Sequence, residues 1–241
     1  MTTSRIAKSA YVSTLRGAGK IARTAGVYSA LQRRLPDRRA HWWLSLFAIH
    51  DIDAMVDLDV PWWSYDAIDK VDAFLAQRDT PRVFEYGSGA STIWAARRAH
   101  HVTSVEHDVD WHPVISNRLS AFSNVELRLI EPDANYNPEY GSKKPGYTSR
   151  SFENYVTAIE GAKGPFDVII IDGRARVACL RHAIAHVAPG GMIVFDNSGR
   201  REYRSPIEAV EAQIKTYRGR VPSLPYPDQT TLIQPTPVAE K

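Results

Sequence analysis

Side chains capable of chemistry gather where short apolar segments end. These segments have the composition of buried β-strands, and each is followed by an acid, an amide or a glycine. The residues at these ends are Glu85, Gly87, Gly89, Glu106, Asp172, Asp196 and Asn197. In a parallel sheet with helices on both faces, ligands bind beyond the carboxyl ends of the strands. We therefore expect these residues to surround one crevice, and so many carboxylates on one rim indicate chemistry rather than packing.

The loop after the first of these segments reads EYGSGAST over residues 85–92. Two glycines at this spacing allow a tight turn and a close approach of the backbone to a ligand. A dinucleotide site would have a third glycine where Thr92 stands, and the acid Glu85 would repel a pyrophosphate. The loop favours a cationic ligand that lacks phosphate, such as S-adenosylmethionine with its sulfonium and ammonium groups. A plain strand-to-helix turn is the alternative.

Glu106 ends the next segment and is followed by His107. A carboxylate at this place can accept hydrogen bonds from both hydroxyls of a ribose. The alternative is a solvated strand end. Together with the glycine loop, Glu106 predicts a ribose site, and His107 is expected near the adenosine.

Strand and helix patterns alternate from residue 82 onward. We expect strands at 82–86, 102–106, 125–130, 166–172, 192–196 and 230–233, and helices at 91–98, 111–122, 152–160, 176–187 and 206–217. This alternation predicts an α/β fold with a doubly wound sheet. Ahead of it, helical spacing is expected in 5–34 and 41–47 and in a segment that opens at Pro61, where Trp62 and Trp63 either cap the crevice or pack in the core.

A polar segment, residues 131–150, interrupts the alternation. It is rich in Tyr, Pro, Gly and Asn, and loops of this length often serve as lids over a site. Tyr136, Tyr140 and Tyr147 lie in it. Lys143 and Lys144 in the same segment either contact an anionic acceptor or are solvated.

Charge is distributed unevenly along the 241 residues. Residues 1–40 hold nine lysines and arginines against one acid, a net charge of +8, and the rest of the chain has a net charge of −5. Because the body of the chain is acidic, we do not expect a nucleic-acid substrate. We expect a helical N-terminal extension over 1–60 that contacts the body, a subunit of a homo-oligomer or an anionic membrane surface, with a mitochondrial presequence as the less favoured reading.

Two further bulk features bear on location. The single cysteine, Cys179, excludes an internal disulfide framework and favours a reducing compartment. No apolar run approaches the length needed to span a bilayer, and no secretory signal is evident. The expectation is a cytoplasmic protein.

Two stretches resemble the class I S-adenosylmethionine-dependent methyltransferases. VFEYGSGASTIWAARRAHHVTSVEHD, from residue 83, looks like their first motif and the acidic strand after it. FDVIIIDGRARVACLRHAIAHVAPGGMIVFDNS, from residue 166, is similar to their fourth strand, helix and fifth strand. The DGRAR and FDNS patterns resemble a bacterial subgroup of O-methyltransferase-like or FkbM-like proteins.

This resemblance covers about residues 61–234 and implies a mostly parallel, seven-stranded sheet in a methyltransferase domain at 61–241. It implies that the cofactor S-adenosylmethionine is held by the first loop, the ribose acid and the end of the fourth strand. Those residues are Glu85, Tyr86, Gly87, Ser88, Gly89, Ser91, Glu106, His107 and Asp172. Glu131 is a candidate for the adenine.

Asp172, Asp196 and Asn197 stand where catechol-type O-methyltransferases carry metal ligands. Three oxygen ligands suit Mg²⁺ or another divalent metal, which would orient an acceptor hydroxyl and lower its pKa. The chain departs from that family because Ala175 replaces a lysine and because it carries Arg174 and Arg176. Arginine is a poor base but binds carboxylate or phosphate well, so an anionic acceptor is expected. Asp172, Arg174 and Asp196 are the candidate catalytic residues.

These features favour methylation of a hydroxyl on a small molecule, such as a sugar or another polyhydroxylated metabolite. An NAD(P)-dependent oxidoreductase is an alternative that lacks its third glycine. An N-methyltransferase of nucleic acid or protein would carry an Asn/Asp-Pro-Pro-aromatic box where Asp172-Gly173-Arg174-Ala175 stands. The third alternative is a non-catalytic, cofactor-binding scaffold whose function depends on the basic arm.

Overall fold

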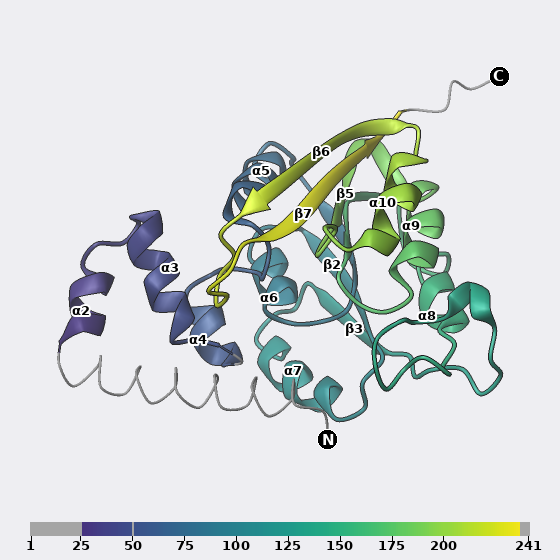
Figure 1. Ribbon diagram of the computed structural model, residues 1–241, viewed down its shortest axis with the longest axis horizontal. Helices are drawn as coiled ribbons and strands as arrows, with labels where there is room; N and C mark the ends of the chain where they lie inside the picture. Colours follow the sequence, from purple (N-terminus) through teal and green to yellow (C-terminus); the bar gives the residue numbers. More distant parts are fainter. Residues whose placement is uncertain (1–25, 50, 237–241) are drawn as a thin grey trace.

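One sheet organises the residues described by the computed structural model, which are 26–49 and 51–236 (Figure 1). Its seven strands follow the order β3-β2-β1-β4-β5-β7-β6. The first five strands run parallel, whereas β7 is antiparallel to both β5 and β6. The strands are β1 (Arg82–Tyr86), β2 (His101–Glu106), β3 (Val125–Leu129), β4 (Phe166–Ile171), β5 (Val187–Phe195), β6 (Ala212–Gly219) and β7 (Asp228–Pro235). The expected mostly parallel, doubly wound sheet is confirmed.

Helices cover both faces of this sheet. Figure 1 shows α5 and α6 on one face and α8, α9 and α10 on the other. The helices that follow β1 are α6 (Ala90–Ala96), α7 (Trp111–Leu119), the 3-10 turn η1 (Pro138–Tyr140), α8 (Glu153–Thr157), α9 (Arg176–Ile184) and α10 (Arg201–Glu208). Those before it are α2 (Val27–Gln32), α3 (Arg38–Leu46), α4 (Ile52–Asp57) and α5 (Tyr65–Leu75). None of the helices in these described ranges is both long and apolar enough to cross a bilayer.

Alternate residues of each central strand enter opposite halves of the core. Val83 packs with α5 and α6, while the next residue, Phe84, packs with α8 and α9. Val168 and Ile169 of β4 divide in the same way. Because side chains alternate across a strand, a strand covered on both faces needs apolar residues at every position. This requirement holds the carboxyl ends of β1 and β4 side by side.

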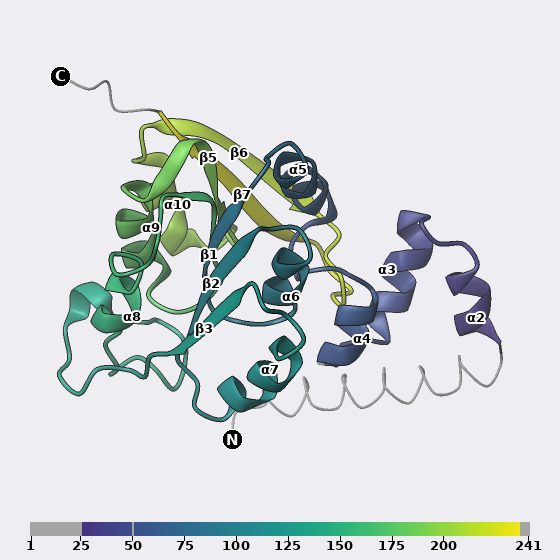
Figure 2. The same cartoon turned by 180° about the vertical axis from the view of Figure 1, so that it is seen from behind.

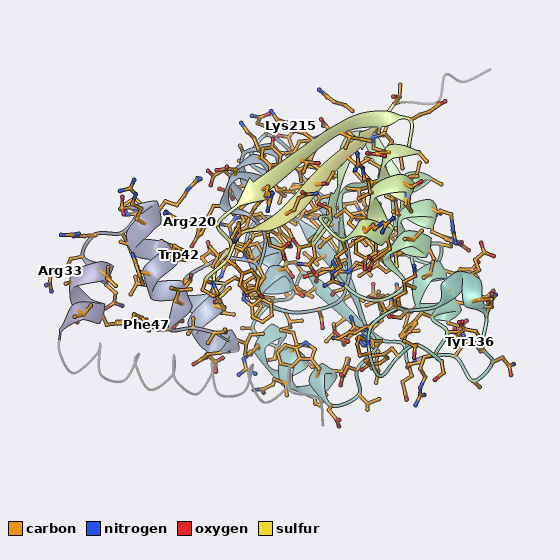
Figure 3. All side chains as sticks on the ribbon, viewed as in Figure 1. Arg33, Trp42, Phe47, Tyr136, Lys215 and Arg220 are labelled. Carbon is orange, nitrogen blue, oxygen red and sulfur yellow. The ribbon has the colours of Figure 1, made fainter. Side chains whose placement is uncertain are left out.

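The N-terminal helices α3 and α4 pack against the body, while α2 lies farther out (Figure 2). Met55 of α4 belongs to the same apolar cluster as the face of α5. Trp42 of α3 donates its indole N–H to the carbonyl of Leu224 at 3.1 Å and lies against the guanidinium of Arg220 (Figure 3). Two hydrogen bonds between Ser45 and Ser223 complete the contact. The extension is therefore joined to the loop before β7.

The sequence prediction fails at the C-terminal end of the chain. The expected helix at 206–217 is wrong: α10 ends at Glu208, and residues from Ala212 onward form β6. Alternation of half-buried and exposed residues along β6 shows the two-residue period of a strand, and Ile214 pairs with Ile233 of β7. A partner strand distant in the sequence supplies the hydrogen bonds, so the local pattern alone could not decide.

Two further element boundaries differ clearly from the expectation. The helix expected up to residue 187 ends at Ile184, because β5 already begins at Val187 and includes the Pro-Gly-Gly segment. The helix expected to open at Pro61 begins at Tyr65, which leaves Trp62 and Trp63 in the segment before it. Residues 5–25 of the expected helical stretch 5–34 lie outside the described residues.

Candidate active site

A cavity of about 390 Å³ opens at the carboxyl ends of β1, β2 and β4. Its size lies within the range of small-molecule sites. The glycine loop forms one wall, the end of β2 a second and the end of β4 a third. The predicted residues that line it are Gly87, Ser88, Gly89, Ser91, Glu106, His107, Asp172 and Arg174. The fold thus brings together most of the residues expected to bind a cofactor.

The two glycines of the loop differ in what they permit. Gly87 has a φ of +97°, and a Cβ there would lie 2.9 Å from the backbone of Gly173. No other residue type fits, since both the conformation and the space exclude a side chain. Gly89 has open space where its Cβ would be, and that space belongs to the cavity. Gly87 therefore serves the fold, and Gly89 leaves room for a ligand.

Glu85 lies beneath the loop and does not line the cavity. Its side chain is completely buried and accepts hydrogen bonds from Ser91 Oγ and Thr92 Oγ1, both at 2.5 Å, and from Ser104 Oγ at 2.7 Å. Burial raises the pKa of Glu85 from its ordinary value of 4.5 to about 7, although these three hydroxyls act in the opposite direction. The expected direct contact with a ligand is replaced by support of the loop from below.

Tyr86 is also turned away from the cavity. Its ring packs among buried side chains near Tyr155, and its hydroxyl donates to the carbonyl of Val156 at 2.7 Å. Its own carbonyl accepts the N–H of Asp172 at 3.0 Å. The expected cofactor contact of Tyr86 is therefore not found, and its backbone instead ties the ends of β1 and β4 together.

Glu106 is a carboxylate held ionised at the cavity wall. One of its oxygens accepts the backbone N–H and the hydroxyl of Ser88, at 3.1 and 2.8 Å. The other accepts the backbone N–H groups of His107 and Asp108, at 2.7 and 2.9 Å, and lies 2.8 Å from His107 Nδ1. Burial acts to raise the pKa of Glu106, but these donors lower it to about 2. The site therefore presents a fixed negative charge.

His107 is enclosed by aromatic rings from the chain that follows β3. The rings of Tyr147, Phe152 and Tyr155 lie at 5.3, 5.7 and 6.1 Å from its own, centroid to centroid. Its Nε2 has no hydrogen-bond partner among the described residues. Tyr147 of the 131–150 segment thus packs behind the cavity wall against His107, and Lys144 of the same segment lines the cavity. Tyr136, in contrast, is 56% exposed at the edge of the molecule (Figure 3).

Asp172, Asp196 and Asn197 meet at a smaller side pocket of about 110 Å³, but they are arranged around an arginine. The buried guanidinium of Arg176 donates to Asp172 Oδ1 at 2.6 Å and to the carbonyl of Asp196 at 2.6 Å. Trp62 and Asp172 line both this pocket and the main cavity. Asp172 therefore stands between the two spaces.

These residues fit a divalent metal poorly. Burial, and then the charge of Asp172, raises the pKa of Asp196 well above its ordinary value. Asn197 donates its amide to Asp228 at 2.9 Å. In the described parts of the chain, no third His, Cys, Asp or Glu side chain joins Asp172 and Asp196 in a group that could hold a metal ion. The expected Mg²⁺ site already holds a cation of the protein itself, the guanidinium of Arg176, beside Asp172.

Arg174 and Arg176 have separate roles that the sequence did not distinguish. The guanidinium of Arg176 donates hydrogen bonds to the backbone carbonyls of Gly173, Asp172 and Asp196. Arg174 lines the main cavity, and its guanidinium lies 4.9 Å from the centre of the Tyr147 ring. Lys144 lines the cavity as well, whereas the exposed Lys143 does not.

Several cavity residues were not expected from the sequence. Ile52 and Met55 of α4 form part of the wall, and Trp111 at the start of α7 donates its indole N–H to the carbonyl of Ser88 at 3.0 Å. Glu131, the candidate for the adenine, is exposed and does not line the cavity. Of these residues, only Trp111 had a local signal in the sequence. It follows aspartates that can cap a helix, and Asp108 Oδ1 accepts the N–H of Trp111 at 3.1 Å.

Comparison with known proteins agrees with this architecture. Residues 84–198 match the family model of a methyltransferase domain. The O-methyltransferase from Bacillus cereus, solved with S-adenosylhomocysteine, is 17% identical, with a TM-score of 0.58 over 88% of this chain and 97% of that one. The O-methyltransferase TomG from Streptomyces achromogenes, solved with S-adenosylmethionine, is 17% identical, with a TM-score of 0.54 over 80% and 89%. No curated protein sequence gave a significant match.

The buried Glu85 predicts a pH-dependent loss of stability. Its folded pKa of about 7 lies above its ordinary 4.5, so its contribution is fully present below pH 4.5 and is lost as the pH rises through 7. We expect the wild type to lose up to about 3 kcal/mol more unfolding free energy than Glu85→Gln between pH 4.5 and 8, measured with urea. The exposed Glu211→Gln should follow the wild type. Parallel curves for all three proteins would contradict the assignment.

Proposed function

We propose that this protein transfers a methyl group from S-adenosylmethionine to a hydroxyl oxygen of a small molecule, since residues 84–198 match the family model of a methyltransferase domain and the sheet has the matching architecture. The observation that carries the proposal is the ionised Glu106 facing a cavity whose other wall is the glycine loop. A sugar or another polyhydroxylated metabolite is among the candidate acceptors.

The wall residues fit the parts of this cofactor. Glu106 would accept the ribose hydroxyls, since a carboxylate is the strongest acceptor for such donors. Gly89 leaves open space next to Ser88, and Asp172 offers a negative charge toward the ammonium group. His107 and Trp111 supply flat surfaces on the adenosine side. When bound, the cofactor supplies an electrophilic methyl group on a sulfonium.

A nicotinamide dinucleotide fits the same loop less well. Pyrophosphate sites use free N–H groups at the start of the helix after β1. Here the hydroxyl of Thr92 accepts the N–H of Gly89 at 2.9 Å, and the N–H of Thr92 donates to the carbonyl of Gly89 at 3.2 Å. Two of the N–H groups at this turn, those of Gly89 and Thr92, are therefore already bonded within the protein.

Asp172 is the residue placed to receive a proton. It lines both the main cavity and the side pocket, so an acceptor hydroxyl that enters between them meets its carboxylate. Arg176 holds that carboxylate in position at 2.6 Å. Asp196 lines only the side pocket, where its Oδ1 accepts the hydroxyl of Thr230 at 2.8 Å, so Asp172 is the better placed carboxylate. Orientation of the hydroxyl by Asp172 and Trp62 would align it with the methyl group.

The first test addresses the ribose contact. Glu106→Ala and Glu106→Gln should weaken binding of S-adenosylhomocysteine by about 10- to 100-fold, because each removes charge-assisted hydrogen bonds worth roughly 1.5–3 kcal/mol. Calorimetry measures the affinity, and thermal unfolding checks the fold. Glu126→Ala, an exposed acid on the neighbouring β3, should bind like the wild type. Unchanged affinity in both Glu106 variants would refute the ribose assignment.

A second test separates an enzyme from a cofactor-binding scaffold. Asp172→Asn keeps the size of the side chain but removes its basicity, so kcat should fall about 100-fold or more. Affinity for S-adenosylhomocysteine should stay within about tenfold. Methyl transfer at the wild-type rate would show that Asp172 does not receive the proton.

The third test concerns the metal. Because the guanidinium of Arg176 already supplies a positive charge beside Asp172, we expect methyl transfer to persist after dialysis against EDTA. Rates before and after addition of Mg²⁺ should agree within about twofold. Loss of activity with EDTA and its recovery with Mg²⁺ would restore the metal-dependent mechanism.

A further inference from the structure

Two cations line the cavity without a carboxylate partner. Lys144, from the 131–150 segment, and Arg174, after β4, face the same space. Among the described residues neither forms an ion pair, and Arg174 Nε is a buried nitrogen with no hydrogen-bond partner. Five other buried or half-buried arginines do have acidic partners, whereas the guanidinium of Arg82 donates to the carbonyl of Lys163. The five are Arg78, Arg98, Arg118, Arg128 and Arg176.

The surroundings of Lys144 leave its charge uncompensated. Burial, followed by the charges of Arg174, Arg176 and Arg200, lowers the pKa of Lys144, and only Asp108 acts in the opposite direction. Asp108 is already occupied, since its Oδ1 accepts the N–H groups at the start of α7. The side chain of Lys144 is exposed and that of Arg174 is half-buried, so both cations are accessible to an arriving anion, which would gain charge-assisted hydrogen bonds from them.

Tyr147 links the two parts of the chain that carry these cations, because its backbone N–H donates to the carbonyl of Lys144 at 2.9 Å and its ring lies beneath Arg174. Arg174 lies over the ring of Tyr147, three residues after Lys144, and its Nη1 donates to the carbonyl of Gly173 at 3.3 Å. Tyr147 in turn packs against His107. The segment and the end of β4 therefore present Lys144 and Arg174 together, next to Asp172.

Another part of the cavity wall is apolar. Ile52 and Met55 of α4 and the ring of Trp62 line the cavity there. A ligand that satisfies both walls has an apolar body and an oxyanion. Lysine and arginine bind carboxylate and phosphate alike, so the two cations define the charge of that group and not its central atom.

We propose that the methyl acceptor is an amphipathic anion, whose carboxylate or phosphate group is bound by Lys144 and Arg174 and whose apolar body lies against Ile52, Met55 and Trp62. This inference rests on the proposed methyl transfer and adds the chemical class of the acceptor. The cations would then hold the anion while the hydroxyl of the same molecule lies at Asp172.

The experiment uses the full-length protein saturated with S-adenosylhomocysteine. Three probes with one hydroxylated aromatic ring are titrated into it by calorimetry: the aryl carboxylate, the aryl phosphate and the neutral primary amide. We expect at least one anion to bind about tenfold or more tightly than the amide. The preferred anion identifies the group that the cations recognise.

The variants Lys144→Ala and Arg174→Gln should each reduce affinity for that anion about tenfold, with little change for the amide. Lys143→Ala is the matched control, because this neighbouring lysine is exposed and does not line the cavity. Arg174→Lys, which keeps the charge, should retain part of the anion affinity. Thermal unfolding verifies that each variant is folded.

Two outcomes would overturn the proposal. The first is that neither anion binds the wild type more tightly than the amide. The second is that Lys144→Ala and Arg174→Gln weaken S-adenosylhomocysteine as much as the anion, because the cations then serve the carboxylate of the cofactor. Failure of the wild type to bind S-adenosylhomocysteine at all would instead refute the proposed function, and the two failures are thus distinguishable.

Discussion

The backbones that follow β1 and β4 approach each other more closely than any side chain would allow. Gly87 and Gly173 face one another, and a Cβ on Gly87 would lie 2.9 Å from the backbone of Gly173. A hydrogen bond from the N–H of Asp172 to the carbonyl of Tyr86 fixes the same junction. From this contact the glycine loop turns toward Glu106 and the β4 loop turns toward Arg174. Both loops line the cavity, so its shape depends on this close approach of the two backbones.

The acids on the rim are chemically unequal. Glu106 is ionised because backbone N–H groups and the hydroxyl of Ser88 surround it, whereas Glu85 and Asp196 hold their protons more tightly because they are buried. Asp172 is paired with Arg176. A count of carboxylates therefore overstates the negative charge that a ligand meets. Neutral acids serve the protein as hydrogen-bonding groups, and the exposed charge is concentrated where the ribose would lie.

The central strands and the glycine loop could be predicted because their signals are local. Continuous β-branched runs such as 166–171 require burial on both faces, and glycine at 87 has no substitute. The antiparallel β6 was missed because its partner, β7, lies beyond a loop and contributes half of the pairing. The mutual position of Arg176 and the two aspartates was also missed, since it depends on how β4 and β5 are aligned, and sequence spacing cannot show that a guanidinium fills the gap between them.

Helix α4 carries a consequence for the N-terminal extension. Ile52 and Met55 are at once part of the cavity wall and part of the contact between the extension and the body. A ligand that fills the cavity would therefore stabilise the seating of α4, and a firmly seated α4 would tighten the ligand, because linkage is reciprocal. Occupancy of the cavity and the seating of α4 on the body would thus change together.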